Sequence, residues 1–468
     1  MATFNRVPFV YDSPAQNKPF SFRGYAGRGH YRGHDRGRGF PSQRSRGRGF
    51  PGPRFVSHDP VGTDSLPTDR GIRDGLSSEP ITKIFSYKLP LSKNTIEITN
   101  AESIGSYNWL DAQFPTILVP GSPAVWNAKP FSYAVLPDTG VVVETHDSCR
   151  LPDAPLLPLM VAVEELQESK HKAFPWHTVD IMADRSNLRK LFRWIHGRGP
   201  NPTTFRIDLF LAGDRTILMK RWEKRDKELG NGFSYGMNFR SEATDLPLGC
   251  KGSVGHQHIV RYNMNGLSMV VRFGVDACLP SSSANLPEAP PKPLATARQN
   301  GGRQSSQPVN KFELLAPDIQ SQYNKDTHGL DVRHGGTLTP LSNLVELTTR
   351  SEARKTFYDW DEGYPQLYLS QTMHHYLAIH HRGTFQSKES RQLDSPEMDH
   401  IRSKLQPRFQ AFHAVLLFIR QIAQDYGENC DLSLVCENGQ LFVYERLNRG
   451  SCLPDEYMDR FHRPRDNA

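Results

Sequence analysis

The sequence predicts a mixed α/β domain, with a central mixed β-sheet flanked by helices, preceded by a disordered tail rich in arginine and glycine. Three observations support this prediction. Short apolar runs alternate with turn residues along most of the chain, residues 396–425 have a helical period, and seven Arg-Gly pairs lie before residue 50. The chain has 468 residues, 37% of them hydrophobic, which suffices for a sizeable core.

The tail carries the whole excess of positive charge. Residues 1–75 contain twelve Arg and one Lys against six Asp, and the rest of the chain has 44 basic and 44 acidic residues. A segment of this composition cannot bury a core, so we expect residues 1–79 to be disordered. Guanidinium groups contact phosphates and stack on bases, and aromatic rings add stacking surface. We predict low-specificity binding of single-stranded RNA by Arg23, Tyr25, Arg28, Tyr31, Arg32, Arg36, Arg38, Arg46 and Arg48. The alternative is a tail that mediates protein contacts or condensation without RNA.

Cysteine usage and hydropathy bear on the cellular compartment. Six scattered cysteines are too few for a disulfide framework, and no two have the spacing of a zinc knuckle; they are Cys149, Cys250, Cys278, Cys430, Cys436 and Cys452. The N-terminus lacks the apolar stretch of a signal peptide, and the longest apolar run, 415–419, is too short to span a bilayer. We therefore expect a protein of the nucleus or cytoplasm that is neither secreted nor membrane-bound.

Strands dominate the first half of the expected domain, which we begin at residue 80. The strands are predicted from short apolar or alternating runs next to turn residues, at 116–119, 205–211, 258–262 and 267–273. The last two flank a turn at 263–266. A helix is predicted over 186–195, with Asp184 as its N-cap.

The second half contains the longest helical pattern. Residues 279–311 are rich in Pro, Ser, Ala, Gly and Gln, which is typical of a linker or a flexible loop. Beyond this segment we predict strands at 344–348 and 366–379, a helix at 396–425, and a hairpin of 432–436 with 441–444 around Asn438-Gly439. Residues 456–468 are expected to form a disordered C-terminus.

Several polar clusters suggest chemistry that their spacing does not support. The pairs His256 and His258, His374 and His375, and His380 and His381 have no Cys or carboxylate at a ligand spacing, so we interpret them as ordinary strand histidines. Residues 359–362, Asp-Trp-Asp-Glu, are interpreted as a solvated turn. The chain has no Asp-Asp pair and too many strands for a prenyl-diphosphate synthase.

A dispersed set of polar residues is more informative. Asp276 follows the predicted strand 267–273, Glu346 lies in the strand 344–348, and Gln366 begins the next strand. Carboxylates at the ends of neighbouring strands can hold Mg²⁺ or Mn²⁺ in a phosphodiesterase, because hard cations need clustered oxygen ligands. The alternative is a set of unrelated surface acids.

Several runs of the sequence resemble a known family. They are SYNWL at 106–110, PTILVPGSP at 115–123, DRSNLRKL at 184–191, GLS at 266–268 and QLYLSQT at 366–372. These runs resemble a family of uncharacterised fungal proteins, some of which carry a geranylgeranyl pyrophosphate synthetase label that the residues do not support. The order of the motifs is in turn similar to that of the decapping exoribonucleases, a resemblance that covers roughly residues 100–445.

The resemblance implies a PD-(D/E)xK-type nuclease fold and a set of site residues. The arginine motif of the family falls on Arg185, and its following glutamine falls on Gln366. Its Glu-x-Asp motif falls on 274–276, where Gly274 replaces the glutamate and Asp276 is kept. The remaining two motifs keep Glu346 but have Thr348 in place of the lysine and Arg240 in place of a glutamate.

These replacements imply that catalysis is impaired. An arginine repels a divalent cation, and loss of one group that stabilises developing charge typically costs on the order of 10²–10³ in rate. Mg²⁺ or Mn²⁺ would be the cofactor of an active enzyme, held by Asp276 and Glu346 with Glu242 as an additional candidate. Glu242 would share the strand face of Arg240, two residues away, and Arg350 stands in the same relation to Thr348.

Three functions follow from the resemblance. We favour an RNA-binding protein with a degenerate nuclease-like domain over a metal-dependent RNase or RNA 5′-end pyrophosphohydrolase. The third alternative is a protein-interaction scaffold with a vestigial nuclease fold. The resemblance also places Asp276 and Glu346 in one sheet, so we expect a single domain over 80–455, with 279–311 as an inserted loop.

Overall fold

The computed structural model describes most of the chain after the tail. Described are residues 68–463 except 144, 170, 198–203, 231, 281–327, 428–429 and 449, all within the compact unit Asp59–Ala468. The predicted RNA-binding residues of the tail, Arg23 to Arg48, lie outside the described residues, and so does nearly all of the expected loop 279–311.

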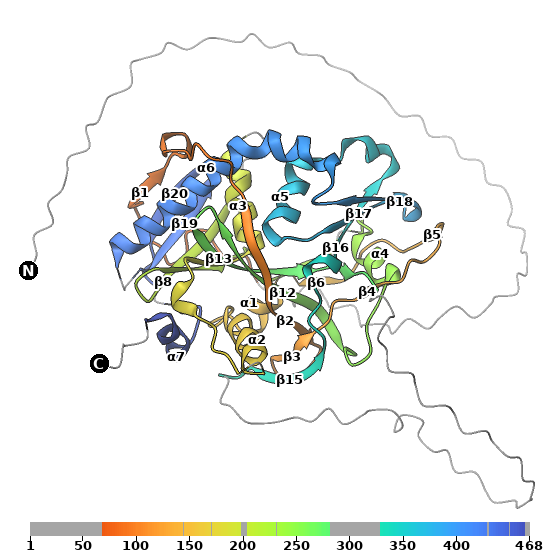
Figure 1. Ribbon diagram of the computed structural model, residues 1–468, viewed down its shortest axis with the longest axis horizontal. Helices are drawn as coiled ribbons and strands as arrows, with labels where there is room; N and C mark the ends of the chain where they lie inside the picture. Colours follow the sequence, from red (N-terminus) through yellow and green to blue (C-terminus); the bar gives the residue numbers. More distant parts are fainter. Residues whose placement is uncertain are drawn as a thin grey trace, which may run out of the picture. The chain divides into compact units, whose positions relative to one another are not determined.

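The larger of two mixed sheets forms the frame of the domain (Figure 1). Its β7 lies parallel to both β13 and β9, and most other neighbours are antiparallel. The strands lie in the order β1 (Thr82–Ile84), β20 (Gln440–Glu445), β19 (Leu432–Glu437), β8 (Phe205–Ala212), β9 (Thr216–Arg221), β7 (Ile181–Asp184), β13 (Leu267–Val275), β12 (Ser253–Met264), β2 (Ile98–Leu110), β3 (Thr116–Gly121) and β15 (Asp331–Gly336).

A smaller mixed sheet begins where β13 ends. Its strands lie in the order β11 (Thr244–Asp245), β4 (Val125–Trp126), β14 (Ala277–Cys278), β16 (Leu344–Ser351), β17 (His374–His381), β18 (Thr384–Gln392) and β5 (Tyr133–Ala134). β16 and β17 are parallel, and the crossover between them contains a helix. A separate pair joins β6 (Val141–Val143) to β10 (Lys227–Leu229).

The helices cover both faces of the larger sheet (Figure 1). Three of them, α3 (Arg185–His196), α5 (Trp360–Ser370) and α6 (Pro396–Tyr426), pack on one face. The other face carries α2 (Leu157–Glu168) and the C-terminal α7 (Asp455–Met458). The remaining described helices are α1 (His146–Arg150), α4 (Gly236–Ala243) and the short 3₁₀ segments η2 (Ser86–Lys88), η3 (Trp176–Thr178), η4 (Leu341–Asn343), η5 (Glu352–Phe357) and η6 (Asp459–Phe461).

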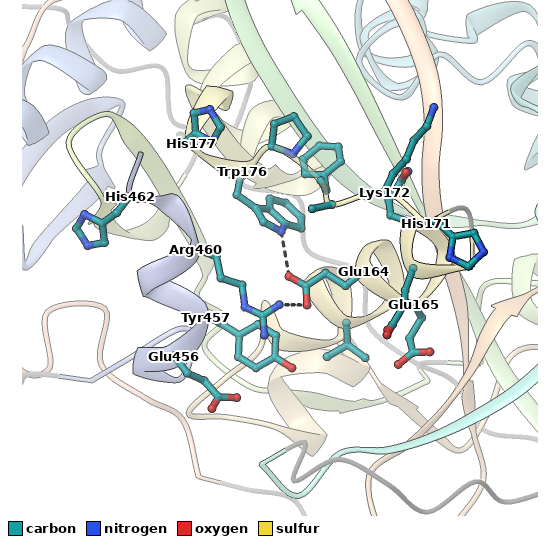
Figure 2. A pocket seen from close by; sticks show the side chains of 16 residues that line it. Glu164, Glu165, His171, Lys172, Trp176, His177, Glu456, Tyr457, Arg460 and His462 are labelled. Atoms are coloured by element: carbon teal, nitrogen blue, oxygen red, sulfur yellow. Dashed lines mark hydrogen bonds and ion pairs between the residues drawn. The ribbon is translucent and has the colours of Figure 1, made fainter. Parts of the chain in front are cut away.

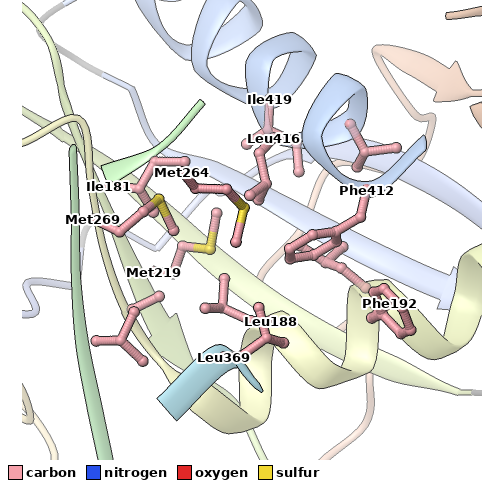
Figure 3. Packing of buried hydrophobic residues seen from close by; sticks show 14 of the residues in the cluster. Ile181, Leu188, Phe192, Met219, Met264, Met269, Leu369, Phe412, Leu416 and Ile419 are labelled. Carbon is pink, nitrogen blue, oxygen red and sulfur yellow. The ribbon is translucent and has the colours of Figure 1, made fainter. Parts of the chain in front are cut away.

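Two hydrophobic cores lie on opposite faces of this sheet because side chains alternate along each strand. In β7, Ile181 and Ala183 point into the core under α3 and α6, whereas Met182 points into the core under α2. Figure 3 shows the first core, where Phe412 and Leu416 of α6 lie over the methionines of the strands. The periodicity that predicted α6 therefore corresponds to its buried stripe.

Several elements agree with the sequence. The mixed fold of sheets flanked by helices is confirmed, with two large sheets where one was expected. The predicted helices over 186–195 and 396–425 correspond to α3 and α6, and the predicted hairpin corresponds to β19 and β20. Among the helices that the structure describes, none combines the length and apolar composition needed to cross a bilayer.

Four predictions were wrong in detail. The residues 366–370 are not a strand but the end of α5. Arg240 and Glu242, which were expected on a strand, lie in the helix α4. The cluster at 359–362 is not a free turn, because Asp359 caps α5 and accepts a hydrogen bond from Asp361 N at 3.0 Å. The C-terminus was expected to be disordered from 456, but residues as far as 461 form α7 and η6, with Tyr457 and Phe461 buried.

Asp184 occupies the N-cap position of α3, but its side chain makes no capping hydrogen bond. It instead accepts from the Nε of Arg272 at 2.7 Å. Arg272 is 2% exposed, and its Nη1 lies 3.0 Å from Oδ1 of the buried Asp147. A buried charge needs partners of this kind, so the arginine ties β13 to the start of α3 and to α1.

Candidate functional site

The candidate site lies where the chain passes from the larger sheet to the smaller one. Asp276 is the single residue between β13 and β14. Its Oδ2 accepts a hydrogen bond from the backbone N of Leu347 at 2.9 Å, in β16. Asp276 is therefore next to Glu346, although 70 residues separate them in the sequence.

Two further predicted residues, Arg185 and Gln366, donate hydrogen bonds to the carboxylate of Glu346. Arg185, the first residue of α3, donates from Nη1 to Glu346 Oε2 at 3.0 Å and to Ser370 Oγ at 3.2 Å. Gln366 of α5 donates from Nε2 to the other oxygen of Glu346. The structure thus brings Asp276, Glu346, Gln366 and Arg185 together, even though Gln366 comes from a helix.

Arg240 forms the other ion pair of the site. Its Nε lies 3.1 Å from Asp276 Oδ1, and its side chain is 47% exposed against 13% for Asp276. Burial raises the pKa of Asp276 to about 6, the guanidinium of Arg240 opposes this rise, and the carboxylate of Glu346 adds to it. Each carboxylate of the site therefore has a guanidinium as its partner.

Glu242 does not join this group. It belongs to α4, where residues two apart point in different directions, so the expected shared strand face with Arg240 does not exist. Its carboxylate forms an ion pair with Lys129, and its carbonyl accepts from Asn127 Nδ2 at 3.1 Å. The prediction of Glu242 beside Asp276 on a strand was wrong because α4 is a helix.

The other two replaced positions differ in character. Gly274 is exposed, and a Cβ built there would meet no atom closer than 3.8 Å, so a larger side chain would fit. Thr348 is engaged through Oγ1 with His375 Nε2 at 3.0 Å. The same nitrogen lies 3.1 Å from the hydroxyl of Tyr358, and burial lowers the pKa of His375 to about 4.

Two further arginines lie next to the site, of which Arg350 was named from the sequence and Arg189 was not. Arg189 lies one turn after Arg185 on α3, and burial, with help from the charges of Arg193 and Arg185, lowers its pKa to about 10. Arg350 of β16 lies over the ring of Tyr358, 5.5 Å from the centroid. The four-residue spacing of the arginines on α3 was the available signal, because residues i and i+4 share a helix face.

The side chains of this site do not fit a resident divalent metal ion. Hard cations need several clustered oxygen ligands, but both carboxylates here are already paired with guanidinium groups. Among the residues that the structure describes, no group of three or more His, Cys, Asp or Glu side chains could hold a metal. The three histidine pairs therefore belong to no such group within the described part of the chain. Four of these histidines, His256, His258, His375 and His380, are buried.

A separate groove of about 1040 Å³ lies on the α2 side of the larger sheet, away from these residues (Figure 2). Glu164 at its centre accepts from Trp176 Nε1 at 3.1 Å and pairs with Arg460. Arg460 also lies over the ring of Tyr457, 4.3 Å from the centroid. The central polar groups of this groove thus satisfy one another.

Comparisons with known proteins give one family and several similar structures. The family described as Domain of unknown function (DUF8563) matches residues 88–462. No curated protein matches the chain significantly.

The similar structures match most of this chain at low sequence identity. Rai1 of Scheffersomyces stipitis in complex with (3′-NADP)+ and calcium ion has a TM-score of 0.48 at 11% identity, covering 81% of this chain and 99% of that chain. Rai1 of Candida albicans in complex with pU5-Mn²⁺ has a TM-score of 0.45 at 11% identity, covering 81% and 98%. Dxo1 of K. lactis in complex with manganese has a TM-score of 0.41 at 7% identity, covering 79% and 96%. These are members of the decapping exoribonuclease family that the sequence motifs resemble.

Proposed function

The chain belongs to the family described as Domain of unknown function (DUF8563), and from the geometry of the candidate site we propose that it is an RNA-binding protein with impaired metal-dependent catalysis. The observation that carries this proposal is the pair of guanidinium groups, Arg240 and Arg185, that engage Asp276 and Glu346. A phosphodiesterase needs these oxygens for metal ions.

The loss of two further groups supports impaired catalysis. Gly274 supplies no carboxylate. Thr348 supplies a hydroxyl in place of an ammonium group, and this hydroxyl is engaged with His375. Removal of a group that stabilises developing negative charge typically costs on the order of 10²–10³ in rate. Several such losses together leave little turnover.

RNA binding is proposed from the chemistry of the arginines. The tail contains seven Arg-Gly pairs with interleaved Tyr and Phe, which suits phosphate contact and base stacking. In the folded part, Arg189, Arg240 and Arg350 lie around the candidate site. Guanidinium groups bind phosphates bidentately, so three arginines around one site suit an RNA backbone without a metal.

The catalytic part of the proposal is tested by incubating the full chain with 5′-triphosphorylated and capped RNA in Mg²⁺ or Mn²⁺. We expect no turnover above that of the double variant Asp276→Ala/Glu346→Ala. Turnover that this double variant abolishes would instead establish a metal-dependent RNase or 5′-end pyrophosphohydrolase. That second function is favoured by the half-exposed side chain of Arg240, which could move away from Asp276.

The binding part is tested by filter binding of single-stranded RNA to the full chain and to a variant in which the tail arginines are replaced by glutamine. We expect a weaker complex for the variant. For the full chain we also expect the logarithm of the affinity to fall linearly with the logarithm of the salt concentration. A response that is flat in salt would contradict phosphate-dominated binding.

A further inference from the structure

Three large apolar side chains are exposed near the start of α4. Phe233 is 87% exposed, Leu136 is 69% exposed and Met237 is 41% exposed. They belong to segments that are joined by hydrogen bonds, since Asn238 Nδ2 donates to Leu136 O at 2.9 Å and Met237 N donates to Asp138 Oδ2 at 3.1 Å. Asp138 N also donates to Ser234 O at 2.7 Å, so the three exposed apolar side chains belong to adjacent backbone segments on one part of the surface.

The turn between β17 and β18 borders this surface and is cationic. Val135 N donates to Gly383 O at 3.0 Å, and the ring of Tyr235 lies 4.9 Å from that of His380. The turn carries the exposed Arg382 next to Gly383. An exposed guanidinium thus lies one residue from the contacts that join the turn to the segments of Leu136 and Phe233.

The start of α4 also lies against β16, the strand that carries Glu346 of the candidate site. A Cβ built on Gly236, the first residue of α4, would lie 3.5 Å from Thr349 Oγ1 of β16. The next residue of β16 is Arg350, which lies over the ring of Tyr358. One turn further along α4, Arg240 reaches Asp276. The start of α4 therefore connects the exposed apolar side chains to Arg350 and Arg240 of the candidate site.

We propose that Leu136, Phe233 and Met237, with Arg350 and Arg382, form an outer platform that binds the bases of a single-stranded RNA. The inference rests on the proposed function, in which the phosphates of the same RNA would contact the arginines around the candidate site. Phe233 supplies the stacking ring, and the two arginines supply phosphate contacts or additional stacking. The platform is distinct from the tail, which binds independently.

Charge favours RNA over a protein as the ligand of this surface. Asp138 is 4% exposed, and its carboxylate accepts from two backbone N–H groups of α4, so it adds no exposed negative charge. Glu352 contributes one exposed carboxylate, 3.9 Å from His381 Nδ1, against the two guanidinium groups of Arg350 and Arg382. Arginines next to an exposed ring are the residues that single-stranded nucleic acid sites combine.

The test uses the full chain and a full-length variant in which the arginines at 23, 28, 32, 36, 38, 46 and 48 are replaced by glutamine. Both are photo-crosslinked to 5′-phosphorylated oligouridine that contains 4-thiouridine, and the crosslinked peptides are mapped by mass spectrometry. We expect crosslinks within 232–240 in both proteins. In the tail variant, Phe233→Ser should weaken RNA binding about tenfold, because a stacked base contributes about 1–3 kcal/mol.

Two further variants make the test specific. Phe233→Trp keeps a stacking ring and should retain the affinity, whereas Phe114→Ser removes a ring that is 69% exposed in the β2–β3 turn and should not change it. Equal thermal unfolding of all four proteins shows that folding is preserved, as expected for exposed positions.

The outcomes separate this inference from the proposed function. If RNA binds but Phe233→Ser behaves like Phe114→Ser and no crosslink maps to the platform, the inference is overturned and the proposed function stands. If neither the full chain nor the tail variant binds RNA, both fail. If Phe233→Ser leaves RNA affinity unchanged and instead dissociates an oligomer in sedimentation, the surface is a protein interface and the RNA proposal is overturned.

Discussion

At the scale of single residues, the guanidinium of Arg240 pairs with the carboxylate of Asp276, which a metal site would need as a ligand. The position of Gly274 shows how small the change is, because this exposed residue has room for a side chain on the strand that leads to Asp276. A guanidinium and a missing carboxylate together remove the oxygen cluster. A metal site could therefore be introduced here by substitution.

We predict that the double variant Gly274→Glu/Arg240→Glu binds Mn²⁺ at least about tenfold more tightly than the wild-type chain. The substitutions add two carboxylates near Asp276 and Glu346 and remove the competing cation. Isothermal titration calorimetry with Mn²⁺ measures the change. The matched control, Gly274→Gln/Arg240→Gln, has the same shape without the charge, and equal Mn²⁺ binding by both variants would contradict the prediction.

Buried histidines make the folded state sensitive to acid. His258 is fully buried, with Nε2 at 2.8 Å from Ser103 Oγ, and burial lowers its pKa from 6.5 to about 3. Below pH 6.5 the unfolded chain takes up a proton at this position, whereas the folded chain does not until about pH 3. Stability contributed by the neutral histidine is therefore lost as the pH falls through this window.

We predict that His258→Gln flattens the pH dependence of the free energy of unfolding between pH 6 and pH 4. The reduction should approach about 1.4 kcal/mol per pH unit, which is the limit for one proton. Urea unfolding at a series of pH values measures it. Parallel curves for the two proteins, offset by a constant from pH 8 downward, would show that His258 does not titrate as described.

The adjacency of the acidic site residues was predicted, whereas their pairing with arginines was not. The spacing of Asp276 and Glu346 left unrelated surface acids as an alternative, and the family resemblance placed the two residues in one sheet. The contact of Arg240 with Asp276 depends on α4 being a helix, which its short and weakly amphipathic sequence does not reveal. His375 and Tyr358 were missed because their roles depend on the parallel register of β16 with β17, a long-range pairing.

At the scale of elements, α5 is the clearest conflict between local sequence and structure. Residues 366–370 have the composition of a strand, and Pro365 lies inside the helix, where it removes a backbone hydrogen bond. The helix forms because Tyr364, Leu367 and Leu369 are buried in the core that α5 shares with α3 and α6. Tertiary burial of this size outweighs intrinsic propensity.

The turn of the β19–β20 hairpin is an element that local sequence determines fully. Asn438 and Gly439 have φ values of 51° and 74°, as a two-residue turn of this kind requires. A Cβ at Gly439 would meet no atom within 4 Å, so only the backbone conformation opposes a side chain. We predict that Gly439→Ala destabilises the protein by about 1–2 kcal/mol, measured by urea unfolding. Asn438→Gly should cost clearly less, and equal costs for the two variants would contradict this account.

The start of α3 depends on Arg272, whose charge is buried between Asp147 and Asp184. We predict that Arg272→Met destabilises the protein by about 3–5 kcal/mol, because the buried Asp147 and the partly buried Asp184 lose their partner. The control Arg333→Met removes a 38% exposed partner of Asp331 and should cost less than about 1 kcal/mol. Similar midpoints for both variants in denaturant unfolding would argue against the buried network.

At the scale of the whole molecule, the chain on either side of residues 281–327 contributes to both sheets. Ala277 and Cys278 of β14 pair with Val345 and Leu344 of β16, and β15 pairs with β3. Each sheet therefore joins residues from both sides of the segment. Composition alone suggested a linker, whereas the family resemblance implied an inserted loop, and these long-range pairings also argue for a single domain.

We predict that replacing residues 282–326 with a Gly-Ser linker of roughly half that length leaves one cooperative unfolding transition. The strand pairings on both sides do not involve the replaced residues, so the two sheets should still unfold together. Fluorescence and circular dichroism followed in the same urea titration should coincide. Two separate transitions would indicate two independent domains.

The guanidinium partners of Asp276 and Glu346 have a consequence for the cell. A cation that is encoded in the chain cannot be chelated, exchanged or diluted, so its occupancy does not depend on the supply of free ions. The electrostatic character of the candidate site is therefore the same in manganese-starved and manganese-replete surroundings.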